Sequence, residues 1–74
     1  MRKTAIVTGA ARGIGLATTD LFLAEGRRVA MIDWDADELA KAAAARENVL
    51  PIRCDVSDPK AVAAMADQIA HDLK

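Results

Sequence analysis

The sequence predicts an α/β fold with a doubly wound parallel sheet. Three short apolar runs alternate with three stretches of helical pattern along the 74 residues. This β-α-β-α-β-α order is typical of parallel strands joined by right-handed crossovers. Three strands normally make up only half of such a sheet. No linker, repeat or charge block interrupts the chain. We therefore expect residues 1–74 to form the first βαβαβα half of one domain, without an internal boundary.

The first strand is expected at Thr4–Thr8, a mostly apolar run that ends at a glycine. Such a run suits a strand that is buried on both faces. A helix should follow, because apolar residues recur with the spacing of one helical face. Gly26 lies where a glycine can end that helix. The predicted buried stripe is Ile14, Ala17, Thr18, Leu21 and Phe22.

The second unit is a strand at Arg28–Asp33 and a helix over residues 36 to about 46. Asp35 can cap this helix, and Glu38, three residues later, completes a pattern like a capping box. The helix is rich in alanine and carries only a weak apolar stripe. That stripe consists of Leu39, Ala42 and Ala43.

The third unit is a strand over residues 49–54 and a final helix. Pro51 has no amide hydrogen to donate to a neighbouring strand, so this strand should lie at or near an edge of the sheet. Asp58 can cap the last helix, and Pro59 suits its first position. The expected apolar face consists of Val62, Met65, Ala66, Ile69 and Leu73.

Composition excludes several classes of function. Ten basic and eleven acidic residues give a net charge of −1 without clustering, which argues against binding nucleic acid or an anionic membrane. The single cysteine cannot form an internal disulfide, as is usual in a reducing compartment. No stretch approaches the roughly 18 apolar residues of a membrane span. We expect a cytoplasmic protein.

A glycine-rich stretch, Thr-Gly-Ala-Ala-Arg-Gly-Ile-Gly at residues 8–15, lies between the first strand and its helix. Gly9 would let the chain turn off the strand, Gly13 would leave room for a pyrophosphate, and Gly15 would let the helix pack closely. The amides at the helix start would then meet the phosphates. The alternative is a tight turn that binds nothing. Three glycines cost conformational entropy on folding, which argues against that alternative.

Asp33, at the end of the second strand, can accept hydrogen bonds from the adenosine ribose hydroxyls of a dinucleotide. Its carboxylate would repel a 2′-phosphate, which favours NAD over NADP. Arg12 argues the other way, since a guanidinium near the adenosine end could bind that phosphate. The alternative for Asp33 is a solvated acid at a strand end.

At these residues the chain resembles the short-chain dehydrogenase/reductase family, whose glycine motif has the spacing Thr-Gly-x-x-x-Gly-Ile-Gly. The resemblance covers essentially the whole chain and implies a Rossmann-type fold. It also implies that Asp55 binds the adenine amino group, with the Val56 amide alongside, and that the Ile14 main chain lies at the pyrophosphate. By the same resemblance Trp34 borders the adenosine pocket, although a packing role is the simpler interpretation of a tryptophan.

The chain departs from the family pattern in its catalytic residues. The Asn-Asn-Ala-Gly segment, the catalytic serine and the Tyr-x-x-x-Lys motif of the family are absent, and the chain contains no tyrosine. We therefore assign cofactor-binding residues and no catalytic ones. The resemblance implies an oxidoreductase that interconverts a secondary alcohol and a carbonyl with NAD. It also suggests a homo-oligomer, a tetramer or a dimer.

Two other functions remain open. The chain could be a stand-alone module that binds a dinucleotide without catalysis, or a Rossmann-type protein that binds S-adenosylmethionine. The latter ligand has no pyrophosphate for the glycine-rich stretch. Three further features are set aside: His71 suits a surface role, Cys54 suits a buried thiol, and the acids between residues 33 and 38 need no metal.

Overall fold

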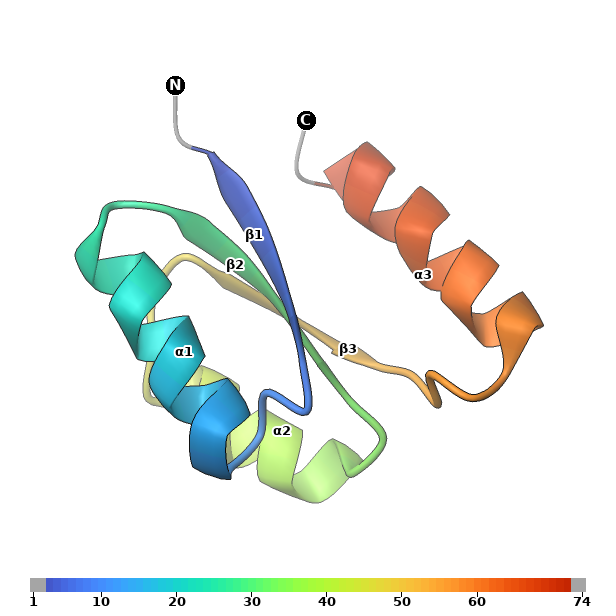
Figure 1. Cartoon of the computed structure of the whole chain (residues 1–74), viewed down its shortest axis with the longest axis horizontal. Helices are drawn as coiled ribbons and strands as arrows, with labels where there is room; N and C mark the ends of the chain where they lie inside the picture. Colours follow the sequence, from blue (N-terminus) through green and yellow to red (C-terminus); the bar gives the residue numbers. More distant parts are fainter. Residues whose placement is uncertain (1–2, 73–74) are drawn as a thin grey trace.

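The structure, a computed structural model, describes residues 3–72 and has the predicted alternation of strands and helices (Figure 1). Helix α2 ends two residues before its expected end near Arg46, and β3 ends at Arg53 rather than at residue 54. The elements are β1 (Thr4–Thr8), α1 (Gly13–Ala24), β2 (Arg28–Asp33), α2 (Ala36–Ala44), β3 (Val49–Arg53) and α3 (Pro59–Asp72).

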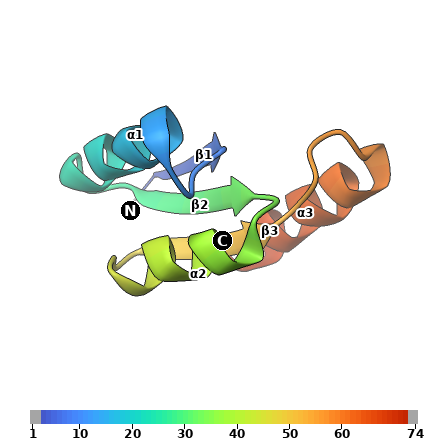
Figure 2. The same cartoon turned by 90° about the horizontal axis from the view of Figure 1, so that it is seen from below.

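The three strands form one parallel sheet in the order β1-β2-β3. Figure 2 shows β2 between its two neighbours, with α3 apart from α1 and α2. In the described residues β3 is an edge strand, which confirms the expectation from Pro51. The order agrees with one half of a doubly wound Rossmann sheet, whose strands run 3-2-1-4-5-6. The predicted fold class is therefore confirmed.

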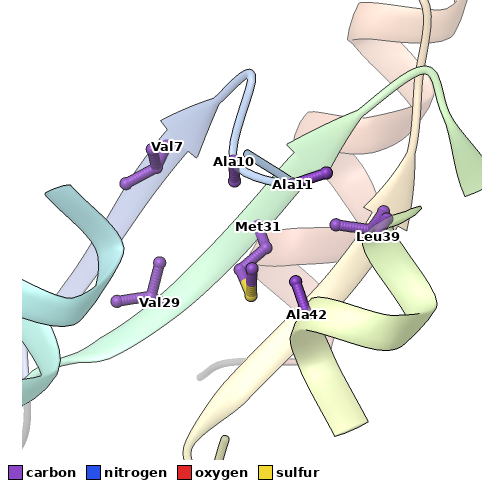
Figure 3. Close-up of a cluster of buried hydrophobic side chains, with 7 residues drawn as sticks. All are labelled: Val7, Ala10, Ala11, Val29, Met31, Leu39 and Ala42. Carbon is purple, nitrogen blue, oxygen red and sulfur yellow. The ribbon is translucent and has the colours of Figure 1, made fainter. Parts of the chain in front are cut away.

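The central strand β2 supplies the core to both faces of the sheet, because successive side chains of a strand point to opposite sides. Val29 and Met31 belong to the cluster on the side of α1 and α2 (Figure 3). Ala30 and Ile32 belong to the cluster under α3. All four are fully buried. This strand therefore has the double burial that its continuous apolar sequence predicts.

Helix α1 departs from its predicted buried face at Ile14, Ala17 and Leu21, where the prediction is wrong, whereas Phe22 packs against the core as predicted. Thr19 is fully buried, and Leu16 and Leu23 pack against the core. Ile14 and Leu21 are 86% and 67% exposed. Ala17 is exposed as well, while Thr18 and Phe22 are half-buried. The physical reason is that α1 carries apolar residues on several sides, so spacing alone allows more than one rotation about its axis.

Helix α3 follows its predicted face in part. Ile69 is buried, and Val62 and Met65 pack against the same cluster, but Ala66 is exposed. Ala66 lies at the edge of the buried face of α3, and its methyl group is too short to reach the sheet from there. Leu73, also predicted for this face, lies outside the described residues. Among residues 3–72, no helix combines the length and the apolar character needed to cross a membrane.

Candidate functional site

A pocket of about 230 Å³ opens where the three strands end. Each strand contributes its last residues or the residues directly after it. This is where ligands bind in open parallel α/β sheets, at the carboxyl ends of the strands. The lining consists of Thr8 and Gly9 after β1, Ile32, Asp33 and Trp34 at the end of β2, and Cys54, Asp55 and Val56 after β3.

The glycine-rich stretch forms the turn from β1 into α1, and its glycines are required by geometry. Gly9 and Gly13 have φ angles of 63° and 59°, the left-handed region that side chains other than glycine disfavour. Gly15 lies in the first turn of α1, where an added Cβ would come within 2.0 Å of the carbonyl oxygen of Gly9. The helix can therefore approach the turn only because residue 15 has no side chain.

In the described part of the chain, the amino end of α1 lacks the side-chain cap that the amino ends of α2 and α3 have. The side chain of Asp35 accepts a hydrogen bond from the Glu38 amide at the start of α2, at 3.2 Å. Asp58 does the same for the Lys60 amide at the start of α3, at 3.0 Å. At α1 the cap residue is Arg12, which makes no such bond, and the first turn holds no acid. The first amides of α1 and its positive dipole end can therefore receive an anion.

Asp33 is buried, at 7% exposure, and both of its carboxylate oxygens have partners. Oδ2 accepts a hydrogen bond from the Ala11 amide and Oδ1 from the Asp35 amide, each at 3.0 Å. The alternative of a solvated strand-end acid is therefore wrong. Because each oxygen has a second lone pair, the fixed carboxylate can still accept hydroxyl donors from the pocket.

Arg12, predicted to lie at the site, pairs with a residue that the sequence assigned only to helix capping. Its Nη2 lies 2.5 Å from Oδ2 of Asp35, while Oδ1 of Asp35 caps α2. The hydrogen bond from the Glu38 amide is the main cause that lowers the pKa of Asp35, and Arg12 lowers it further. No spacing rule predicts this ion pair, because the two residues are far apart in the sequence and meet only through the fold.

Asp55 follows β3, and its own turn holds it in place. Its Oδ1 accepts hydrogen bonds from the Ser57 hydroxyl at 2.6 Å and from the Ser57 amide at 2.9 Å. The hydroxyl bond is the main cause that lowers the pKa of Asp55, so this carboxylate is ionised at neutral pH. An ionised acid can accept a hydrogen bond from an amino group. Ser57 was not predicted from the sequence.

Trp34 and Val56 are 69% and 56% exposed and both line the pocket. The expectation that Trp34 serves mainly in packing is therefore wrong. Its carbonyl accepts a hydrogen bond from Nε of Arg53 at 3.2 Å, which ties the end of β2 to that of β3. Sequence reasoning did not assign Thr8, Ile32 or Cys54 to the lining. Each of the three directly precedes a predicted site residue in the sequence, and this adjacency could have indicated that they line the pocket.

The predicted site residues fall into two adjoining groups. Five of them line the pocket, namely Gly9, Asp33, Trp34, Asp55 and Val56. The other four, Arg12, Gly13, Ile14 and Gly15, are the cap and first residues of α1, which adjoins Gly9. Cys54 is buried, as expected for a structural thiol. His71 is exposed on α3, as expected for a surface residue.

The chain is similar to known proteins over most of its length. The model of the short chain dehydrogenase family matches residues 3–74. An uncharacterized short-chain type dehydrogenase/reductase of Sinorhizobium fredii is 42% identical over an alignment of length 74 that covers 90% of this chain and 29% of that protein. The chain thus spans less than a third of the length of this relative.

Solved structures share the fold, and two of them were determined with a nicotinamide dinucleotide bound. A short chain dehydrogenase/reductase from Burkholderia phymatum, in complex with NAD, has a TM-score of 0.83 at 34% identity, covering 90% of this chain and 25% of that one. An NADPH-bound short chain oxidoreductase from Pseudomonas aeruginosa has a TM-score of 0.92 at 36% identity, covering 96% and 30%. A nicotinamide dinucleotide is thus the ligand of both. The chain therefore belongs to the short-chain dehydrogenase family of oxidoreductases.

Proposed function

We propose that the chain is the NAD-binding part of an oxidoreductase that interconverts a secondary alcohol and a carbonyl. The observation that carries the proposal is Asp33, a buried carboxylate that is fixed by two backbone amides and lines the pocket. Holding a charged group in this way costs free energy unless its hydrogen bonds are satisfied. Such an arrangement suits recognition of paired ribose hydroxyls.

The other residues would hold the remaining parts of the dinucleotide. The uncapped start of α1, with Gly13 and Ile14, would bind the pyrophosphate through backbone amides. Asp55 would accept the adenine amino group, with the Val56 amide beside it. The exposed ring of Trp34 would border the adenosine. Each assignment uses a group that lies at the pocket or at the adjoining helix start.

When bound, the nicotinamide would supply the hydride-transfer chemistry. The chain would contribute binding and orientation, and it lacks the tyrosine that the family pattern uses as acid and base. We propose that the catalytic serine, tyrosine and lysine of the family pattern would come from a part of the protein beyond residue 74. The substrate would be a small-molecule alcohol or carbonyl compound.

The test is to measure the affinity of the full-length protein and its Asp33→Ala variant for NAD by calorimetry. We expect the dissociation constant to rise about tenfold or more, since hydrogen bonds to a charged group are worth about 1.5–3 kcal/mol. Trp34 provides a second readout, because a ligand at the pocket should change its fluorescence. Trp34→Phe identifies the part of that signal that belongs to this residue.

Asp67→Ala, which removes an exposed acid from α3, is the matched control and should leave the affinity unchanged. Because Asp33 also ties the loop to α2, circular dichroism of each variant must confirm that it is folded. An affinity within a factor of two of the wild type would show that Asp33 does not bind the ribose. Parallel titration with S-adenosylmethionine separates the rival ligand, and binding of that ligand instead of NAD would contradict the proposal.

A further inference from the structure

The charged groups around Asp33 form a connected set. The Ala11 amide donates to one oxygen of Asp33, and the Asp35 amide donates to the other. The residue after Ala11 is Arg12, whose guanidinium pairs with the side chain of Asp35. One of the two residues that donate to Asp33, Asp35, is therefore ion-paired with the residue that follows the other donor, Ala11. A group bound to Asp33 through a ribose hydroxyl would lie beside this pair.

Asp35 holds Arg12 from a fixed position. One of its oxygens caps α2 through the Glu38 amide at 3.2 Å, and the other receives Nη2 of Arg12 at 2.5 Å. The cap fixes the carboxylate relative to the helix, so the guanidinium is held on the side of α2. Arg12 is still 63% exposed in its side chain, which leaves it able to reach a ligand if released.

We propose that Asp35 is a specificity-determining residue that selects NAD by holding the guanidinium of Arg12 away from the 2′-position of the ribose. The proposal rests on the dinucleotide binding proposed above. Arg12 is the only basic residue of the glycine-rich stretch and thus its one candidate partner for a 2′-phosphate. While Asp35 occupies it, that phosphate meets two carboxylates and an arginine whose charge is already matched.

The charges explain why this pair would discriminate. A phosphate monoester carries a charge of about −1.5 to −2 at neutral pH, and a guanidinium is its strongest side-chain partner when both prongs of the fork are available. NAD has hydroxyls at the same ribose positions and gains nothing from a released arginine. Freeing Arg12 should therefore change the affinity for NADP much more than the affinity for NAD.

Asp35→Asn tests the proposal, because it removes the charge that holds Arg12 while asparagine remains a good helix cap. Calorimetry on the full-length protein would give the dissociation constants for NAD and NADP at low salt. We expect the preference for NAD over NADP to fall about tenfold. This is the change in affinity that a hydrogen bond between charged groups typically gives. Asp35→Ser, which also caps, is a second variant in case the first does not fold.

A second substitution decides whether Arg12 is responsible. Arg12→Gln in the wild type should change the preference less than about threefold, whereas in the Asp35→Asn background it should restore most of the lost preference. Such non-additivity is the signature of two residues that act as a pair. Glu38→Gln is the matched control, because it removes a charge from the same helix turn that pairs with Lys41 rather than with Arg12.

The outcomes separate this proposal from the one on which it rests. A wild type that binds neither dinucleotide would contradict the proposed function. A wild type that binds NAD, with an unchanged preference in Asp35→Asn and Asp35→Ser, would overturn only the role of Asp35. If the preference falls equally with and without Arg12, removal of negative charge explains the change and release of the arginine is refuted.

Discussion

Single residues determine the backbone geometry of the site, and Gly15 shows this most directly. Its Cα lies so close to the turn that a Cβ would meet the Gly9 carbonyl oxygen at 2.0 Å. Gly13 differs, since a Cβ there would meet nothing within 4 Å and only its φ of 59° disfavours a side chain. Glycine is therefore needed at residue 15 because a side chain would clash, and at residue 13 because the backbone is left-handed.

We expect Gly15→Ala to lower the free energy of unfolding by about 3 kcal/mol, because the clash is with backbone that cannot move aside cheaply. Gly13→Ala should cost only about 1 kcal/mol, the penalty for a left-handed residue. Urea denaturation of the full-length protein and both variants measures the two values. Equal losses would show that close approach at residue 15 does not matter for stability.

At the scale of elements, one ion pair links the two helices on the same face of the sheet. Arg46, just after α2, donates through Nε and Nη2 to the two oxygens of Asp20 on α1, at 2.7 and 2.9 Å. Its Nη1 also donates to the Ala42 carbonyl at 2.9 Å. The hydrogen bond from Arg46 is the main cause that lowers the pKa of Asp20.

Asp20→Asn should lower the melting temperature at neutral pH, and the difference from the wild type should depend on pH. A carboxyl whose pKa is lowered by folding contributes its full stability above its unfolded value. The contribution should persist above pH 3.8, the ordinary value, and disappear as the pH falls through the lower folded pKa. Melting curves at several pH values give the comparison.

Glu25→Gln is the control for this prediction. Glu25 pairs with Arg27, two residues away, and so cannot connect two helices. We expect it to change the melting temperature less than Asp20→Asn does. A melting temperature of Asp20→Asn that equals that of the wild type at neutral pH would show that the bridge contributes nothing to stability.

At the scale of the whole molecule, the described structure leaves apolar surface uncovered. Ile6 on β1 is 55% exposed, and it lies opposite Ala30, which places it on the side of α3. Leu21 on α1 is 67% exposed. β1 is also an edge of the sheet in residues 3–72. Exposed apolar groups beside an unpaired strand edge favour association.

We therefore expect a peptide of residues 1–74, prepared alone, to self-associate. Light scattering with size-exclusion chromatography gives its mass in solution. Ile6→Thr combined with Leu21→Gln should reduce the association, because both changes replace exposed apolar groups. A folded species at the monomer mass of 7.8 kDa would contradict the prediction and favour a stand-alone binding module.

The sequence by itself determined the order of the elements, the caps of α2 and α3, the edge position of β3 and the family. These features depend on local patterns: apolar runs, an aspartate at a helix start, a proline without an amide hydrogen and a glycine spacing. The sequence also identified Asp33 as a candidate ribose-binding residue, because an acid at the end of the strand that follows a glycine motif can accept hydrogen bonds from ribose hydroxyls.

Only the tertiary structure decided the rotation of α1, the burial of Asp33 and the pairing of Arg12 with Asp35. The rotation of α1 follows from the contact of Gly15 with Gly9, which places Thr19 one turn later against the core. Asp33 is buried because the segments that contain Ala11 and Asp35 pack against its carboxylate and donate their amides to it. Arg12 meets Asp35 because parallel strands bring their carboxyl ends to one edge. Such contacts join residues from separate elements, and no periodicity along the chain encodes them.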